Sequence, residues 1–350
     1  MSRFFSKSLA SLTPYAPGEQ PQDKEYVKLN TNESPFPPSA RAQAMAAKAA
    51  QKLQLYPDPT CRVLRERLGA LYGLTPDEVV VTNGSDEVLS FAFMAFCDKG
   101  AIFPDITYGF YRVFADLYRI PFEEIPLKDD FTIDINAYKG RPETVFIANP
   151  NAPTGIPLTV AQIEEIVASN PDRVVVVDEA YVDFGGDSCA PLVTKYDNLL
   201  VTGTFSKSRS MAGARLGFGF ANPALIRDLE TLRYSTNPYN INRMTMAAGL
   251  GQLVDEEETR HNCRTIVENR QYTITMLSQM GFDVLPSAAN FVFAKHPAIG
   301  GKNLYLRLKE KGILVRHFDK PRLKEYNRIT IGSRDQMDAL LTAIKDILEE

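Results

Sequence analysis

Residues 199–207 read Leu-Leu-Val-Thr-Gly-Thr-Phe-Ser-Lys, an apolar run that passes into small polar residues and ends on a lysine. The segment 199–202 predicts a strand buried on both faces, because short continuous apolar runs are typical of parallel sheets covered by helices. Ligands of such sheets bind beyond the carboxyl ends of the strands. Lys207 is therefore expected at the ligand-binding edge of an α/β protein.

Other apolar runs repeat this pattern along the chain. They predict further strands at 79–82, 144–148, 173–177 and 216–220. Short strands that alternate with helical patterns are typical of a mostly parallel sheet with crossover helices. Gly84, Asn151, Asp178 and Lys207 each follow a predicted strand end, so we expect them to meet at one edge of the sheet.

The helices and the second domain are predicted in the same way. We expect helices at 85–97, from Thr159 with Gln162 as its capping-box partner, and continuously over 243–280. A smaller α+β part is expected to hold strands at 289–294 and 328–331 and a closing helix at 336–348. A chain of 350 residues is too long for most single cores. The predicted division is a large domain, 30–250, and a small domain with an N-terminal arm, 1–29 and 251–350.

Composition excludes several classes of protein. The formal net charge of -4 argues against a nucleic-acid surface, which normally carries a basic excess. No apolar run approaches the roughly 18 residues that span a bilayer, so we expect no membrane partner. The cysteines and histidines are dispersed, which predicts reduced thiols and no metal site: Cys61, Cys97, Cys189, Cys263, His261, His296 and His317. The cytoplasm is the expected compartment.

Lys207 is followed after one short loop by Arg215. Pyridoxal chemistry requires a lysine amine, which forms an imine with the cofactor aldehyde and later moves protons at the substrate Cα. It also requires an anion site for the cofactor phosphate, which Arg215 can supply with the hydroxyls of Thr204 and Ser206. The segment 83–87, Asn-Gly-Ser-Asp-Glu, opens a helix after a strand, and free N–H groups at a helix start bind phosphate.

Asp178 ends the run Val174 to Val177, so its carboxylate is expected in a dry crevice, where a charge needs a partner. The pyridinium nitrogen of pyridoxal phosphate is such a partner, and the pair keeps the ring electron-withdrawing. Three further side chains have roles at the same ring. Tyr181 is expected to donate its phenol to the ring 3-oxygen, Asn151 to offer its amide there, and Tyr108 to stack on the ring face.

Several longer motifs resemble the class I and II aminotransferase family, and in particular its histidinol-phosphate branch. They are LNTNESPFPP at 29–38, YPDP at 56–59, NGSDE at 83–87, NPNAPTG at 149–155, DEAY at 178–181 and TFSKSRSMAGARLGFG at 204–219. The resemblance runs from about Tyr15 to the final helix and implies a fold-type I, pyridoxal-phosphate-dependent transferase. It departs from many relatives at Ala152, where they have Asn; the expected ring contact here is Asn151.

The resemblance also assigns roles by position. Lys207 is implied as the Schiff-base lysine, Asp178 as the pyridinium partner, Tyr181 as a catalytic contact to the 3-oxygen, and Ser85 and Asp86 as lining of the phosphate end. Tyr56 is implied to reach the cofactor phosphate of a neighbouring subunit, which makes the protein a homodimer. The implied substrate pocket consists of Tyr15, Asn32, Asn290, Arg316 and Arg328. Guanidinium groups suit bidentate recognition of phosphate or carboxylate.

The implied reaction is ping-pong transamination between L-histidinol phosphate and 2-oxoglutarate, giving imidazole acetol phosphate and L-glutamate. Three alternatives remain open on the sequence. An aromatic amino-acid aminotransferase and a threonine-phosphate decarboxylase of the same fold would use the same motifs. A non-catalytic α/β module could bind a phosphate ligand at the NGSDE helix start, but it leaves Lys207, Asp178 and Arg215 unexplained. A nicotinamide-linked dehydrogenase is disfavoured because no GxGxxG follows the first strand.

Overall fold

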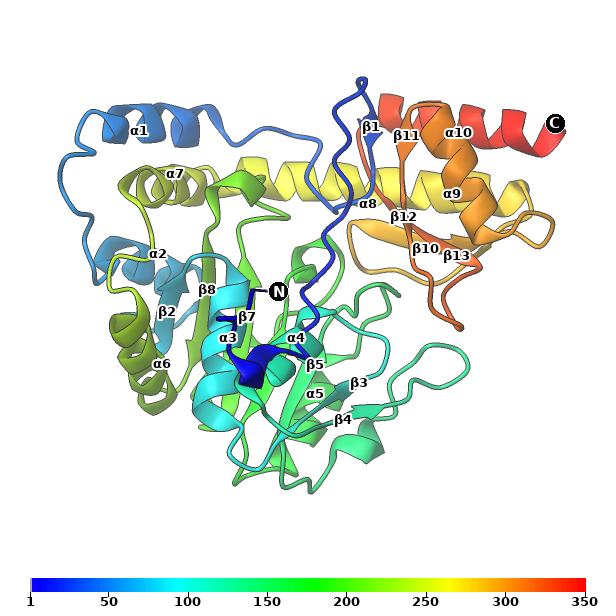
Figure 1. Cartoon of the computed structure of the whole chain (residues 1–350). Coiled ribbons are helices and arrows are strands. Elements are labelled where there is room, and N and C mark those ends of the chain that lie inside the picture. The colour runs from blue at the N-terminus through cyan, green and yellow to red at the C-terminus, as the bar shows by residue number, and fades with distance from the viewer. Residues whose placement is uncertain (1) are drawn as a thin grey trace.

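A seven-stranded sheet forms the centre of the larger part of the molecule (Figure 1). The computed structural model describes residues 2–350. The strand order is β2-β8-β7-β6-β5-β3-β4. The bounds are β2 Val79–Thr82, β3 Ala101–Pro104, β4 Phe122–Ile125, β5 Thr144–Ala148, β6 Val175–Asp178, β7 Leu199–Thr204 and β8 Gly217–Ala221. β8 is antiparallel to both of its neighbours, and the pairs from β7 to β4 are parallel. The predicted mostly parallel sheet is confirmed.

Helices cover both faces of this sheet. One face packs against α3, α4 and α6, and the other against α2, α5 and α7. The bounds are α1 Ala40–Ala50, α2 Arg62–Tyr72, α3 Ser85–Phe96, α4 Phe110–Tyr118, α5 Val160–Ala168, α6 Pro223–Thr236 and α7 Arg243–Val254. The capping box at the start of α5 is confirmed, with Thr159 and Gln162 as its two members.

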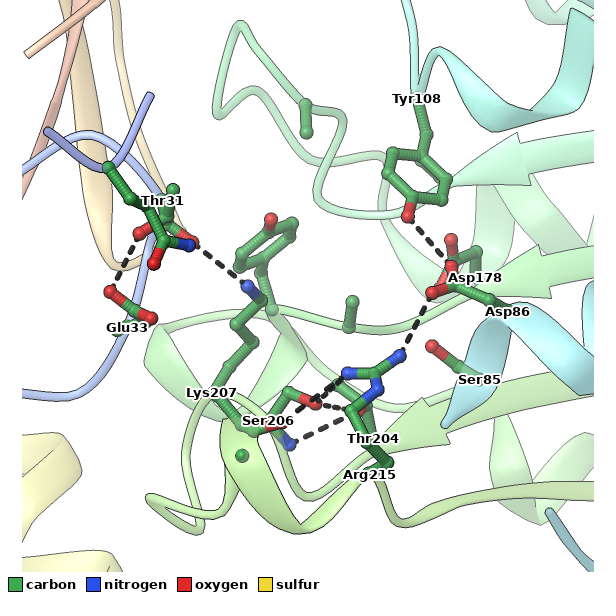
Figure 2. Close-up of a pocket in the computed structure, with 17 residues that line it drawn as sticks. Thr31, Glu33, Ser85, Asp86, Tyr108, Asp178, Thr204, Ser206, Lys207 and Arg215 are labelled. Atoms are coloured by element: carbon green, nitrogen blue, oxygen red, sulfur yellow. Dashed lines mark hydrogen bonds and ion pairs between the residues drawn. The ribbon is translucent and has the colours of Figure 1, made fainter. Parts of the chain in front are cut away.

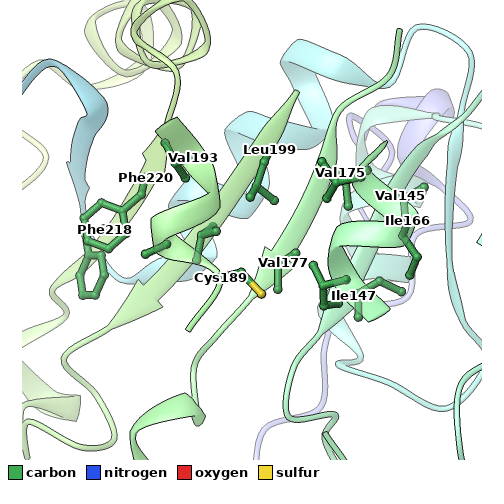
Figure 3. Packing of buried hydrophobic residues seen from close by; sticks show 14 of the residues in the cluster. Val145, Ile147, Ile166, Val175, Val177, Cys189, Val193, Leu199, Phe218 and Phe220 are labelled. Atoms are coloured by element: carbon green, nitrogen blue, oxygen red, sulfur yellow. The ribbon is translucent and has the colours of Figure 1, made fainter. Parts of the chain in front are cut away.

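The central strands are apolar throughout because both of their faces are buried. Val145, Ile147, Val175 and Val177 point to the cluster beside α5, which Figure 3 shows. The alternate residues of the same strands, such as Phe146, belong to the opposite cluster beneath α3 and α4. Successive strand residues point to opposite faces, so double burial removes the polar positions that a one-sided sheet would show.

A four-stranded antiparallel sheet with three helices makes up the smaller part, at the upper right of Figure 1. Its strand order is β12-β13-β10-β9, and a separate pair joins β1 to β11 in parallel. The bounds are β1 Val27–Lys28, β9 Asp283–Val284, β10 Phe291–Lys295, β11 Ile313–Leu314, β12 Arg316–His317, β13 Tyr326–Thr330, α8 Glu256–Gln279, α9 Gly301–Glu310 and α10 Arg334–Glu349. The predicted domain boundaries at 30 and 250 stay predictions.

The helix predicted continuously over 243–280 is wrong at one point. Asp255 leaves helical geometry, with φ -95° and ψ 40°, and separates α7 from α8. Its carboxylate accepts a hydrogen bond from Arg41 Nε at 3.0 Å. The strand predicted to start at 173 starts at Val175. Within residues 2–350, no helix combines the length and the apolar character that crossing a membrane requires.

Candidate active site

A cavity of about 390 Å³ opens at the carboxyl edge of the large sheet (Figure 2). The loops after β2, β3, β6 and β7 bring side chains to it that are far apart in sequence. The predicted residues that line it are Ser85, Asp86, Tyr108, Asp178, Tyr181, Thr204, Ser206, Lys207 and Arg215. The convergence predicted from strand ends is therefore observed for these residues.

Lys207 lies on the loop after β7 and points into this cavity (Figure 2). Its Nζ donates a hydrogen bond to the backbone oxygen of Thr31 at 3.2 Å. Burial, and secondly the positive charge of Arg328, lower the pKa of Lys207 to about 8. A lysine with a lowered pKa has a substantial neutral, nucleophilic fraction near neutral pH.

Asp178 ends β6 and is only 5% exposed. Its Oδ1 accepts a hydrogen bond from Thr202 Oγ1 at 3.1 Å, and its Oδ2 accepts one from Tyr111 Oη at 3.1 Å. Burial raises the pKa of Asp178 to about 6, while these hydrogen bonds oppose the rise. A buried carboxylate of this kind is stabilised by a cationic partner, which a protonated ring nitrogen would be.

An anion site lies at the start of α3. Gly84 caps this helix with no side chain and has φ +77°, which glycine adopts without strain. Arg215 donates from Nη1 to Ser206 Oγ at 3.4 Å and pairs through Nη2 with Asp86 at 3.1 Å. The helix start, the guanidinium and the hydroxyls of Thr204 and Ser206 together provide the donors that a phosphate requires.

Asp86 holds two of the surrounding side chains in place. Its Oδ1 accepts a hydrogen bond from Tyr108 Oη at 2.7 Å, and its Oδ2 pairs with Arg215. A carboxylate repels a phosphate, so Asp86 serves this end of the cavity through Tyr108 and Arg215. The stacking of Tyr108 on a cofactor ring stays a prediction.

A second cavity of about 410 Å³ shares Thr31, Tyr108, Ala152, Tyr181 and Lys207 with the first. Four of the predicted substrate residues line it: Tyr15, Asn32, Arg316 and Arg328. Lys320, which was not predicted, adds another cation. No aspartate or glutamate is among the lining residues that the structure describes. The cavity therefore suits an anionic substrate.

The two arginines are held in different ways. Arg328 donates from Nη2 to the backbone oxygen of Asn30 at 2.9 Å, and its buried Nε has no hydrogen-bond partner within residues 2–350. Arg316 donates from Nη1 to Pro17 O at 3.1 Å and from Nη2 to Ala16 O at 3.0 Å. An unpaired buried N–H is costly, so Arg328 is poised for an acceptor supplied by a ligand.

A family model described as "Aminotransferase class I and II" matches residues 24–344. This chain belongs to that family. A histidinol-phosphate aminotransferase of Brachyspira hyodysenteriae is 47% identical over 353 aligned residues, covering all of both chains. One from a Marinomonas species is 49% identical, covering 99% of this chain and 100% of its own length. The solved histidinol-phosphate aminotransferase of Sinorhizobium meliloti, in complex with pyridoxal-5'-phosphate, has a TM-score of 0.89 at 22% identity, covering 100% of this chain and 98% of that one.

Asn151 does not reach the cofactor cavity of this aminotransferase, so its predicted ring contact is wrong. The side chain is 1% exposed, and hydrogen bonds to neighbouring protein groups hold it in place. Its Nδ2 donates to Ile106 O at 2.9 Å and to Thr154 Oγ1 at 3.2 Å, and its Oδ1 accepts from Thr107 Oγ1 at 2.8 Å. The next residue, Ala152, lines the cavity and has no polar side chain to offer.

The predicted substrate contact of Asn290 also requires correction, whereas that of Asn32 stays a prediction. Asn290 lines neither cavity; its Nδ2 donates to the backbone oxygen of Asn32 at 3.0 Å. Asn32 lines the substrate cavity, but its amide is engaged at both ends. Its Nδ2 donates to Tyr181 Oη at 3.0 Å, and its Oδ1 accepts from Thr330 Oγ1 at 3.0 Å. Asn32 therefore contacts Tyr181 directly, and Asn290 contacts Asn32.

Tyr56 lies outside both cavities of its own chain. It is 77% exposed, and its ring stacks on Tyr239 with centroids 4.5 Å apart. Arg243 Nη2 donates to its backbone oxygen at 2.5 Å. The predicted contact with a neighbouring subunit's cofactor stays a prediction, and the exposed position is compatible with it.

Sequence reasoning missed three residues that contact the catalytic side chains: Thr31, Tyr111 and Thr202. Thr202 could have been found, because aligning the ends of the two predicted strands pairs it with Asp178, as observed in the register. Thr31 contributes a backbone oxygen, for which side-chain chemistry gives no signal. Tyr111 lies in the first turn of α4, a helix that was not predicted.

Proposed function

We propose that this aminotransferase uses pyridoxal 5'-phosphate to exchange an amino group between L-histidinol phosphate and 2-oxoglutarate, giving imidazole acetol phosphate and L-glutamate in histidine biosynthesis. The cofactor assignment rests on the observation that one cavity is lined by Lys207, Asp178 and Arg215. The substrate class is supported by the acid-free cavity around Arg316 and Arg328. The relatives' names supply the particular substrate.

Bound pyridoxal phosphate supplies an electrophilic aldehyde and a ring that accepts electron density from the substrate Cα. Lys207 is the residue that would hold the aldehyde, and its free amine would take and return the proton at the substrate Cα. Its lowered pKa of about 8 favours the neutral amine that this work requires.

The remaining ring and phosphate contacts are assigned to residues of the same cavity. Asp178 would hold a proton on the ring nitrogen, and Tyr181 would donate its phenol to the ring 3-oxygen. The phosphate takes the donors at the start of α3 and around Arg215, namely Ser85, Thr204, Ser206 and the Arg215 guanidinium. Tyr108 covers the ring face.

In ping-pong transamination both substrates use one site in turn, so one set of groups must accept phosphate and carboxylate. Arg316 and Arg328 can do so, because a guanidinium pairs with either anion through parallel N–H donors. The buried Nε of Arg328 gains an acceptor when an anion binds. Tyr15 closes the cavity by stacking on Phe110, with ring centroids 4.3 Å apart.

We also propose a homodimer in which Tyr56 of one copy reaches the cofactor phosphate of the other. Support comes from exposed apolar side chains on the loop that carries Tyr56 (Leu53 and Leu55) and at the start of α7 (Met244). Such side chains gathered on one surface favour burial by a partner. Domains of 30–250 and of 1–29 with 251–350, and a cytoplasmic location, complete the proposal.

Turnover of three amine substrates by the cofactor-loaded enzyme tests the substrate assignment. Histidinol phosphate, phenylalanine and threonine phosphate are each supplied with 2-oxoglutarate, and glutamate and carbon dioxide are measured. We expect histidinol phosphate to give the highest kcat/KM and no carbon dioxide. A higher kcat/KM for phenylalanine would assign an aromatic aminotransferase. Release of carbon dioxide from threonine phosphate would assign a decarboxylase.

A further inference from the structure

Tyr111 is a fully buried tyrosine whose hydroxyl reaches Asp178. The side chain is 0% exposed and packs among Phe93, Phe103 and Phe146, which come from α3, β3 and β5. Its Oη donates to Asp178 Oδ2 at 3.1 Å. The surrounding cluster is otherwise apolar on this side of the sheet.

A phenylalanine would satisfy the packing of this cluster equally well. Burying a hydroxyl among aromatic rings is costly unless it is hydrogen-bonded, and a hydrogen bond to an ionised acceptor is stronger than one between neutral groups. The buried hydroxyl of Tyr111 is therefore explained by its hydrogen bond to the Asp178 carboxylate, which is itself buried and charged. Tyr111 and Asp178 stabilise each other.

The other oxygen of the carboxylate is held in the same manner from the opposite side. Thr202 lies directly across from Asp178 in the β6–β7 register, and its Oγ1 donates to Oδ1 at 3.1 Å. Each carboxylate oxygen therefore has one hydroxyl donor. Asp86, Tyr108 and Tyr181 are the other acidic and phenolic groups that act on Asp178 or feel its charge, and the cations Lys207 and Arg215 line the same cavity.

Tyr111 also contacts the face of the site where Tyr108 stands. The two rings meet edge to face, with centroids 5.8 Å apart and an interplanar angle of 89°. Edge-to-face pairs are a preferred aromatic geometry. One side chain therefore supports both the carboxylate assigned to the ring nitrogen and the aromatic ring assigned to the ring face.

We propose that Tyr111 and Thr202 are positioning residues that keep the Asp178 carboxylate ionised and aimed at the cofactor ring nitrogen. This inference rests on the proposed role of Asp178. In Tyr111→Phe, the carboxylate loses a donor that favours its charged form, so its hold on the ring proton weakens. Thr202→Val, which keeps the shape of the side chain, is expected to act in the same direction from the other oxygen.

Ring-labelled ¹⁵N pyridoxal phosphate bound to each variant tests the proposal, because the ¹⁵N chemical shift reports whether the ring nitrogen carries a proton. We compare wild type, Tyr111→Phe, Thr202→Val and Asp178→Asn. The matched control is Tyr138→Phe, since Tyr138 is 1% exposed and its hydroxyl has no partner within residues 2–350. Cofactor release into buffer and thermal unfolding are measured on the same samples.

We expect wild type and Tyr138→Phe to keep the ring nitrogen protonated, and Asp178→Asn to lose that proton. Tyr111→Phe should show a smaller protonated fraction of the ring nitrogen than wild type at the same pH, because the proton shifts toward Asp178, and should bind the cofactor about tenfold more weakly, the cost of one hydrogen bond to a charged group. Tyr111→Phe behaving like Tyr138→Phe would overturn the inference and leave the role of Asp178 standing. An unprotonated ring nitrogen in wild type would overturn both.

Discussion

Asn32 Nδ2 donates a hydrogen bond to the phenol oxygen of Tyr181 at 3.0 Å, and this bond joins the segment after β1 to the cofactor cavity. The same amide accepts from Thr330 on β13, and the backbone oxygen of Asn32 accepts from Asn290. Tyr181 also packs edge to face on Phe291 of β10, with ring centroids 5.1 Å apart. Tyr181 is thus connected to the smaller part of the molecule by a hydrogen bond and by an aromatic contact.

We predict that Asn32→Ala raises the pKa of Tyr181, because burial raises that pKa and the hydrogen bond from Asn32 opposes the rise. The loss of one neutral hydrogen bond, about 1 kcal/mol, corresponds to about a fivefold lower kcat/KM. The pH dependence of the bound cofactor's absorbance should also shift. Asn136→Ala, at an exposed position, serves as the control. If the pH dependence of the absorbance did not shift in Asn32→Ala, Asn32 would have no influence on the pKa of Tyr181.

Lys207→Ala is expected to abolish both the visible absorbance of the bound cofactor and the transaminase activity. The physical reason is that Lys207 is the amine in the cavity that Asp178 and Arg215 also line. Absorbance after incubation with pyridoxal phosphate and glutamate formation are the two measurements, with the exposed Lys99→Ala as control. Normal turnover by Lys207→Ala would refute the lysine assignment.

The pH dependence of cofactor capture should report the interaction between Lys207 and Arg328. The neutral amine reacts with the aldehyde, so capture by the cofactor-free enzyme should rise with pH through about 8, the pKa of Lys207. Arg328 lowers that pKa, so Arg328→Met should move the midpoint to higher pH. Stopped-flow absorbance from pH 6 to 10 measures it. The control Arg264→Met, on the surface of α8, should have the same midpoint as wild type. If Arg328→Met also has the wild-type midpoint, the interaction between Lys207 and Arg328 is contradicted.

Glu179 should make the stability of the cofactor-free protein depend on pH. Burial raises its pKa to about 7, although Cys189 N and Ser188 Oγ each donate to it at 2.6 Å. A carboxyl with a raised folded pKa contributes stability that is complete below its unfolded pKa, near 4.5, and is lost as the pH rises through about 7.

The size of this contribution is about 3 kcal/mol between those two pH values. Glu179→Gln removes the titration, so its free energy of unfolding should fall less than that of wild type between pH 5 and 8. Chemical denaturation at several pH values measures the difference, with the exposed Glu66→Gln run in parallel. Parallel curves for wild type and Glu179→Gln would contradict the prediction.

Shared active sites predict complementation between two inactive variants. In a hybrid dimer of Lys207→Ala and Tyr56→Ala chains, one of the two sites has both an intact lysine and an intact partner tyrosine. Random mixing should therefore restore about a quarter of wild-type activity. Glutamate formation after co-refolding measures it. No recovery, with hybrid dimers demonstrated, would show that Tyr56 does not serve a neighbouring site.

Most of the strands that are buried on both faces were predicted from their apolar runs, including β2 and β5 at their observed bounds. Strand β3, Ala101–Pro104, is equally buried but was not predicted. Helices α1, α2, α4, α6 and α9 were not predicted either. At Asp255, where the predicted long helix breaks, the side chain bonds to Arg41, a contact distant in sequence that no local pattern contains.

The residues of the candidate site were also predicted only in part. Side chains that follow strand ends converged as expected, because the sheet brings those ends to one edge. Asn151 failed because its hydrogen bonds to Ile106 and Thr107, on the loop after β3, hold it away from the cavity, and its neighbour Ala152 lines the cavity instead. The roles of Asn32 and Asn290 depend on contacts between the two parts of the molecule, which strand and helix patterns do not specify.

Arg316 grips the backbone oxygens of Ala16 and Pro17, so the chain close to its beginning forms a wall of the substrate cavity. The opposite terminus ends helix α10 at the outer side of the smaller part (Figure 1). An affinity tag or a surface linker attached at Glu350 leaves that wall untouched. An addition directly in front of Tyr15 would adjoin that wall, which makes the C-terminal end the one to choose for immobilising the enzyme.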